Sequence, residues 1–126
     1  MARILLVEDH QEIWDFLSRR LKRRGHEISV AEDGQAGLDQ ARAEKPELIL
    51  LDMNLPVMDG WEATRQLKSD GRTAHIPVVA LTAHDGSGEL QRATRAGCDW
   101  FVPKPCPPDA LIAEVRRVLS SPPRSA

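Results

Sequence analysis

Short apolar runs alternate along the chain with segments in which apolar residues recur every three or four positions. A short apolar run predicts a buried strand, and the three-or-four spacing predicts a helix with one face turned to a core. Strands are expected at residues 3–7, 28–31, 48–51, 77–81 and 100–102. Helices are expected at residues 13–24, over about ten residues ending before Pro46, and at 61–68, 89–96 and 108–119. The alternation predicts an α/β fold, a parallel sheet with helices on both faces and right-handed crossovers.

The run from Leu48 to Leu51 is predicted to be a central strand of this sheet. Its four consecutive apolar residues suit a strand that is buried on both faces. The run ends at the carboxylate of Asp52 and then enters a turn containing Asn54 and Pro56. Open α/β sheets place their chemistry at the carboxyl ends of the strands, so Asp52 is the candidate reactive residue.

The first predicted helix carries a basic and an apolar face. Ile13, Phe16, Leu17 and Leu21 are expected on its inner face, because they follow helical spacing. Trp14 lies off this stripe and is expected to be partly exposed.

The candidate functional side chains follow the first, third, fourth and fifth predicted strands. Glu8, Asp9, Asp52, Thr82 and Lys104 should therefore meet at one edge of the sheet. Three neighbouring carboxylates raise one another's pKa unless a cation lies among them, and Mg²⁺ (or Mn²⁺) prefers such oxygen ligands. A phosphoryl group fits the remaining hydroxyl and ammonium, with Asp52 as the nucleophile that forms an acyl phosphate.

Composition narrows the classes of partner. A length of 126 residues is that of one domain, expected over residues 1–120 with a disordered tail at 121–126. The net charge of −2 gives no electrostatic case for binding nucleic acid or an anionic membrane. No apolar run could span a bilayer, no signal peptide precedes the first strand, and the two cysteines make no disulfide framework. A cytoplasmic setting is expected.

Four motifs in this order closely resemble the receiver domain of two-component response regulators. They are Ile4–Asp9, Leu51–Gly60, Leu81–Ala83 and Lys104-Pro105. The resemblance implies the chemotaxis-Y-like, or flavodoxin-like, (βα)5 fold with strand order 2-1-3-4-5. It also implies a single-domain regulator that takes a phosphoryl group from a histidine kinase or phosphotransfer protein and then controls a separate effector protein. Such a protein catalyses only its own phosphorylation and dephosphorylation, and is a switch, not an enzyme.

The resemblance also assigns roles to individual residues. Asp52 would be the phosphoacceptor, and Asp9 and Asp52 would bind the metal directly. Asn54 would add its backbone carbonyl to the metal, and Glu8 would act through a water. Thr82 would bind the phosphoryl group with Lys104, and Thr82 and Phe101 would form the conformational switch. The output face would be the fourth helix, fifth strand and fifth helix.

Some assignments stay open. His84 follows Thr82 closely and is hypothesised to tune the access of water to the acyl phosphate, whereas the other histidines show no metal-ligand spacing and are expected at the surface. Trp14 is either a ring folded along its helix or a docking anchor for the kinase or phosphotransfer protein.

Three other functions compete with this reading. The main alternative is a phosphorylation-independent pseudo-receiver that only binds partner proteins. A flavin-binding electron carrier is disfavoured because Glu8 and Asp9 would repel its phosphate. A paired-aspartate phosphatase is disfavoured because Asn54 stands where its second acid belongs.

Overall fold

The structure is a computed structural model that describes residues 2–83, 88–104 and 107–120. At positions 83, 89, 90 and 104 it describes only the backbone. Its sheet is entirely parallel with the order β2-β1-β3-β4-β5, as expected from the resemblance. The strands are β1 (Arg3–Val7), β2 (Glu27–Ala31), β3 (Leu48–Asp52), β4 (Val78–Ala83) and β5 (Trp100–Lys104). The helices are α1 (Gln11–Arg23), α2 (Gly34–Glu44), α3 (Gly60–Ser69), α4 (Glu89–Ala96) and α5 (Pro108–Ser120).

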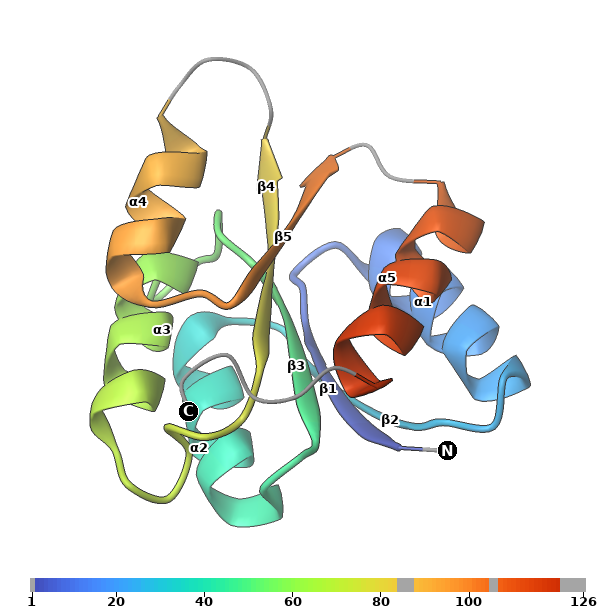
Figure 1. Ribbon diagram of the computed structural model, residues 1–126, viewed down its shortest axis with the longest axis horizontal. Coiled ribbons are helices and arrows are strands. Elements are labelled where there is room, and N and C mark those ends of the chain that lie inside the picture. The colour runs from blue at the N-terminus through green and yellow to red at the C-terminus, as the bar shows by residue number, and fades with distance from the viewer. Residues whose placement is uncertain (1, 84–87, 105–106, 121–126) are drawn as a thin grey trace.

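The helices cover both faces of the sheet, with α1 and α5 on one side and α2, α3 and α4 on the other (Figure 1). Two apolar clusters fill the two layers, because successive side chains of a strand point to opposite faces. Ile49 and Leu51 belong to one cluster, whereas Leu48 and Leu50 belong to the other. All five residues of β3 are buried, which confirms the prediction of a central strand. The weaker β2 lies at an edge of the sheet.

The buried face of α1 differs from the predicted one. Leu17 and Leu21 are buried as expected, but Ile13 is 39% exposed and Phe16 is 47% exposed, so their assignment to the inner face was wrong. Trp14 is half-buried and packs against the cluster under α1 and α5. The side chains that face inward are those at positions 14, 17, 18 and 21. They follow helical spacing, but the stripe begins at Trp14 and not at Ile13.

Strands β4 and β5 extend further than predicted at their carboxyl ends. Pairing continues from Leu81 and Val102 through Thr82 with Pro103 to Ala83 with Lys104. The apolar runs end at Leu81 and Val102, yet the backbone ladder continues for two more residues on each strand, past Thr82 and Pro103.

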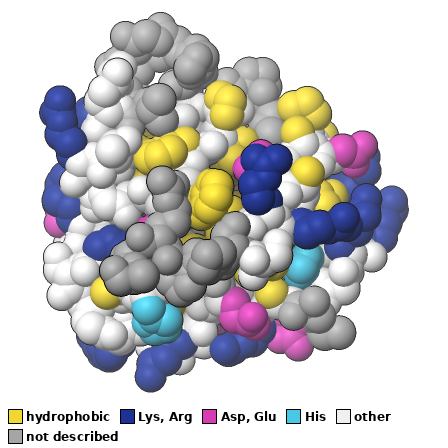
Figure 2. All heavy atoms as spheres, in the orientation of Figure 1, with side chains coloured by type: hydrophobic (Ala, Val, Ile, Leu, Met, Phe, Trp, Pro, Cys, Tyr) yellow, Lys and Arg dark blue, Asp and Glu magenta, His cyan; other side chains and the backbone are white. Residues whose placement is uncertain are grey.

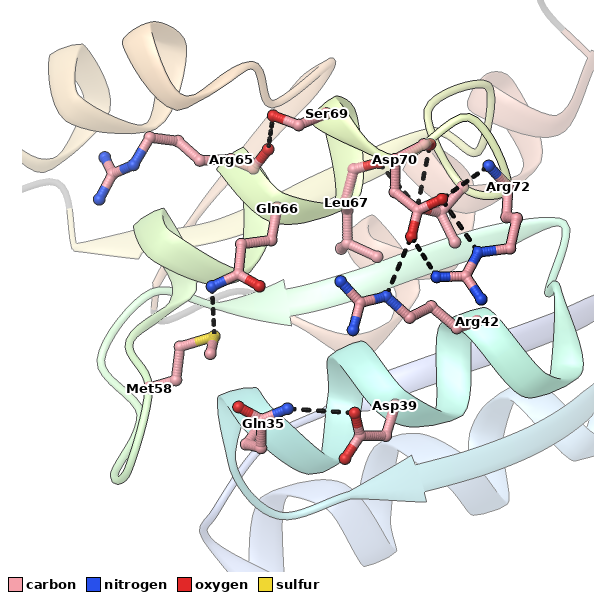
Figure 3. Close-up of polar contacts among 11 residues, drawn as sticks. Gln35, Asp39, Arg42, Met58, Arg65, Gln66, Leu67, Ser69, Asp70 and Arg72 are labelled. Atoms are coloured by element: carbon pink, nitrogen blue, oxygen red, sulfur yellow. Dashed lines mark hydrogen bonds and ion pairs between the residues drawn. The ribbon is translucent and has the colours of Figure 1, made fainter.

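The second helical layer is joined by a charged contact outside the core. Asp70, just after α3, lies 3.1 Å from Arg42 of α2 and 2.7 Å from Arg72 (Figure 3). The backbone N–H of Arg72 also donates to the Asp70 carboxylate at 2.9 Å. Asp70 therefore ties α2 to the connection between α3 and β4.

None of the helices in the described ranges combines the length and the apolar composition needed to cross a membrane. The predicted tail at residues 121–126 lies outside the described residues.

Candidate functional site

Asp52 is the last residue of β3 and is fully buried at the carboxyl edge of the sheet. Its register partner on β4 is Leu81, the residue just before Thr82. Its Oδ1 accepts a hydrogen bond from the backbone N–H of Asn54 at 3.3 Å, so the turn after β3 begins on this carboxylate. A carboxylate with no exposed surface, at the end of a central strand, is held in one place by the sheet.

The loop between β3 and α3 is packed closely against Asp52. Asp59 caps α3 by accepting from the backbone N–H of Glu62 at 2.9 Å, and Gly60 donates its N–H to the carbonyl of Met53 at 2.9 Å. A Cβ at position 60 would lie 2.5 Å from the carbonyl oxygen of Asp52. Glycine is required here because any larger residue would push α3 away from the end of β3.

Glu8 and Asp9 follow β1 and lie beside Asp52. Glu8 is fully buried and Asp9 is partly exposed. Each of these acids offers a potential metal ligand atom within 4.8 Å of one from Asp52. The sheet thus assembles the three carboxylates expected from the sequence, although Asp52 lies more than forty positions after Glu8 and Asp9.

His10 is a fourth member of this cluster, and the sequence interpretation missed it. It is exposed, as expected, but its Nδ1 lies 3.0 Å from Glu8 Oε2 and 3.3 Å from Asp9 Oδ1. The hydrogen bond with Glu8, followed by the charge of Asp9, raises the pKa of His10. The available signal was its position directly after two acids at the end of a strand; histidine pairs with metal-ligand spacing were the wrong feature to seek.

Three further predicted residues, Thr82, Phe101 and Lys104, lie on β4 and β5. Thr82 is buried one residue beyond the register partner of Asp52. Phe101 is half-buried and packs against the cluster under α2, α3 and α4. Lys104 pairs with Ala83 through the backbone of β5, and its side chain lies outside the description. His84 also lies outside the described residues.

The arrangement brings a buried carboxylate, two further acids and a buried hydroxyl to one edge of a parallel sheet. Comparison with known proteins identifies it: residues 4–116 match the family model of the response regulator receiver domain. The chain belongs to the receiver domain family. The resemblance inferred from the four motifs is thereby confirmed.

Curated relatives of this receiver domain include both short and long proteins. It is 36% identical over 120 residues to the protein PilH of Pseudomonas aeruginosa, covering 95% of this chain and 99% of PilH. It is 41% identical over 115 residues to the response regulator PleD of Caulobacter vibrioides, covering 91% of this chain but 25% of PleD. Receiver domains of this sequence type therefore occur alone and within longer proteins.

A solved receiver domain has the same arrangement of strands and helices. The receiver domain of a sensor histidine kinase from Pseudomonas aeruginosa superposes with a TM-score of 0.89 at 29% identity, over 95% of this chain and 98% of that one. That structure has a magnesium ion coordinated in its active-site cleft.

Proposed function

We propose that this receiver domain is a phosphorylation-driven signalling switch with Asp52 as the phosphoacceptor. The observation that carries the proposal is the cluster in which ligand atoms of Glu8, Asp9 and Asp52 lie within 4.8 Å of one another. Carboxylates at this separation oppose one another's ionisation, and a divalent cation among them removes that cost. The donor set of acidic oxygens suits Mg²⁺.

In this proposal Asp9 and Asp52 hold Mg²⁺ directly, Asn54 adds its backbone carbonyl and Glu8 acts through a water. When bound, the metal supplies positive charge next to the oxygens of the transferring phosphoryl group. The cluster fits this role because two of its three carboxyl groups are fully buried and all three lie close together.

The chemical step uses the Asp52 carboxylate as nucleophile. One of its oxygens attacks the phosphorus of a phosphohistidine, a P–O bond forms, and the P–N bond breaks. The electron pair of that bond stays on the imidazole nitrogen of the donor, which takes up a proton. Thr82 donates a hydrogen bond from its hydroxyl to one oxygen of the new phosphoryl group, and Lys104 binds another oxygen of that group. Phe101 repacks when Thr82 moves.

The switch requires no independent substrate to turn over. It catalyses its own phosphorylation and the hydrolysis of its own acyl phosphate. The phosphorylated form binds a separate effector protein through α4, β5 and α5, and the protein acts within the cytoplasm. His84 sets the access of water to the acyl phosphate in this scheme.

The direct test is phosphoryl transfer to purified protein. Incubation with acetyl phosphate and Mg²⁺ should add one phosphoryl group, measured by intact-protein mass, and the label should be absent with EDTA or in Asp52→Asn. Thr82→Ala keeps the nucleophile and should still be labelled. A folded wild-type protein that takes no label from acetyl phosphate or from any phosphorylated kinase would instead favour the phosphorylation-independent binding module.

Residues next to Trp14 are better candidates than Trp14 itself for docking the protein that donates the phosphoryl group. Trp14 is half-buried, whereas Ile13 and Phe16 expose large apolar side chains on the same helix. Basic side chains lie in the last turn of α1, and Figure 2 shows Lys and Arg side chains gathered at the edge of the molecule where α1 and α5 lie. Exposed aromatic residues beside charged ones are frequent anchors of protein interfaces. We therefore propose that Ile13 and Phe16, with the exposed edge of Trp14, dock the helix bundle of a histidine kinase or phosphotransfer protein.

Two phosphoryl donors separate docking from chemistry. Phe16→Ala should slow transfer from the phosphorylated partner protein by about tenfold or more, the loss expected for an interface anchor, but leave labelling by acetyl phosphate unchanged. Equal rates from the protein donor in wild type and variant would contradict docking at Phe16. Slower labelling from both donors would point to a disturbed fold.

A further inference from the structure

His10 brings a nitrogen donor into a cluster otherwise made of carboxylates. Its Nδ1 lies 3.0 Å from Glu8 Oε2 and 3.3 Å from Asp9 Oδ1. Ligand atoms of Glu8, Asp9, His10 and Asp52 all lie within 4.8 Å of one another. A cation that takes oxygens from Asp9 and Asp52 therefore has an imidazole among its nearest side-chain neighbours.

The backbone of His10 is fixed, while its ring is not locked by packing. His10 is the N-cap residue of α1, and its carbonyl accepts from the N–H groups of Ile13 and Trp14 at 3.1 and 3.0 Å. Its own N–H donates to Glu8 Oε2 at 3.2 Å. The side chain is 64% exposed, so the ring can turn toward a bound cation without disrupting the core.

We propose that His10 is a direct ligand of the cation bound by Asp9 and Asp52. We further propose that its nitrogen shifts the preference of the site from Mg²⁺ toward Mn²⁺ and other divalent transition metals. Mg²⁺ strongly prefers oxygen, whereas first-row transition cations accept imidazole readily and bind mixed nitrogen and oxygen sites more tightly. This inference rests on the proposed function, since it takes Asp9 and Asp52 as the metal carboxylates.

A purely ionic role for His10 makes the opposite prediction. In that role a positively charged His10 would only neutralise Glu8 and Asp9, whose oxygens lie 3.0 and 3.3 Å from its Nδ1. Such a cation would compete with the metal, and its removal would strengthen the binding of Mg²⁺ and Mn²⁺ alike. A ligand behaves differently, because its removal weakens Mn²⁺ binding and changes Mg²⁺ binding little.

The test combines cation affinities with a spectroscopic readout of the bound nitrogen. Dissociation constants for Mg²⁺ and Mn²⁺ are measured by calorimetry on wild type, His10→Asn and His75→Ala. Asparagine is a preferred N-cap residue, so His10→Asn keeps the start of α1 while removing the imidazole. His75 is an exposed histidine before the amino end of β4, at the opposite edge of the sheet, and serves as the matched control.

In wild type and His75→Ala, pulsed electron paramagnetic resonance of bound Mn²⁺ should detect coupling to an imidazole nitrogen. The coupling should disappear in His10→Asn. In this variant the affinity for Mn²⁺ should fall by about tenfold, a loss typical of changes around a metal site. The affinity for Mg²⁺ should change by less than about threefold.

Other outcomes overturn the inference in distinguishable ways. Bound Mn²⁺ without nitrogen coupling in wild type would show that His10 is not a ligand and would leave the proposed function intact. Tighter binding of both cations in His10→Asn would establish the ionic role in its place. A folded wild type that binds neither cation and takes no label from acetyl phosphate would remove the proposed function together with the inference.

Discussion

Val57 has a backbone conformation that is unusual for a β-branched residue. It has φ of +68°, and it lies between Pro56 and Met58, whose carbonyl and N–H form a hydrogen bond of 2.7 Å. This is a three-residue turn with a β-branched residue in the left-handed region, where the Cβ is crowded. The side chain is 83% exposed, so no burial offsets the strain.

Relief of this strain should stabilise the protein. We expect Val57→Asn to raise the free energy of unfolding by about 1 kcal/mol, because asparagine tolerates the left-handed region and valine does not. Urea denaturation measures the change. Val57→Thr is the matched control, since threonine is also β-branched and should bring no gain. Equal stability of all three proteins would mean that the turn relaxes at no cost.

Helix α4 is attached to α3 by a contact between an arginine and a tryptophan. The guanidinium of Arg92 lies 3.6 Å from the centre of the Trp61 ring, which is otherwise buried. Trp61 directly follows Gly60, the residue packed against the carbonyl of Asp52. The contact therefore joins α4 to the part of α3 that is closest to the site.

Removal of this arginine should uncover the tryptophan. In Arg92→Ala we expect greater quenching of tryptophan fluorescence by acrylamide and a loss of about 0.5–2 kcal/mol in the free energy of unfolding. Arg95→Ala is the control, because Arg95 is an exposed arginine in the last turn of the same helix. Identical quenching in the two variants would mean that Arg92 does not cover the ring.

At the scale of the whole molecule, the layer of α2 and α3 depends on the charge of Asp70. Hydrogen bonds from Arg72, and then from Arg42, hold the pKa of Asp70 well below its ordinary value near 4. The folded protein therefore holds this carboxylate ionised at pH values where the unfolded chain would bind a proton. Its contribution to stability is complete above the ordinary pKa and is lost as the pH falls through that value toward the lower one of the folded protein.

Asp70→Asn should accordingly be less stable than wild type at about pH 7, with a difference that shrinks below about pH 4. Urea denaturation across this pH range measures the effect. Asp39→Asn is the control, because Asp39 is an exposed acid of α2 that accepts from the neutral amide of Gln35 (Figure 3). A difference that persists unchanged at low pH would show that Asp70 acts through its shape and not its charge.

Most of the fold could be predicted because the positions of its strands and helices follow from local patterns of apolar and polar residues. The apolar run before Asp52 predicted a central strand, and β3 is buried throughout. Spacing alone defines less well which residue begins the buried face of a helix. Ile13 and Trp14 are adjacent and both apolar, and only the packing of α1 against the sheet and α5 selected Trp14 as the inward one.

The sequence by itself determined the order of strands and helices and the acids at the ends of strands, because periodicity and residue type are local properties. Only the tertiary structure decided that His10 shares the site with these acids, and how closely the side chains approach one another. His10 follows Glu8 and Asp9 directly in the sequence and looks like a surface histidine there. It comes close to Asp52 because parallel pairing of β1 with β3 brings the ends of these two strands together. Distances between side chains depend on strand register and helix packing, and these are set by contacts across the whole chain.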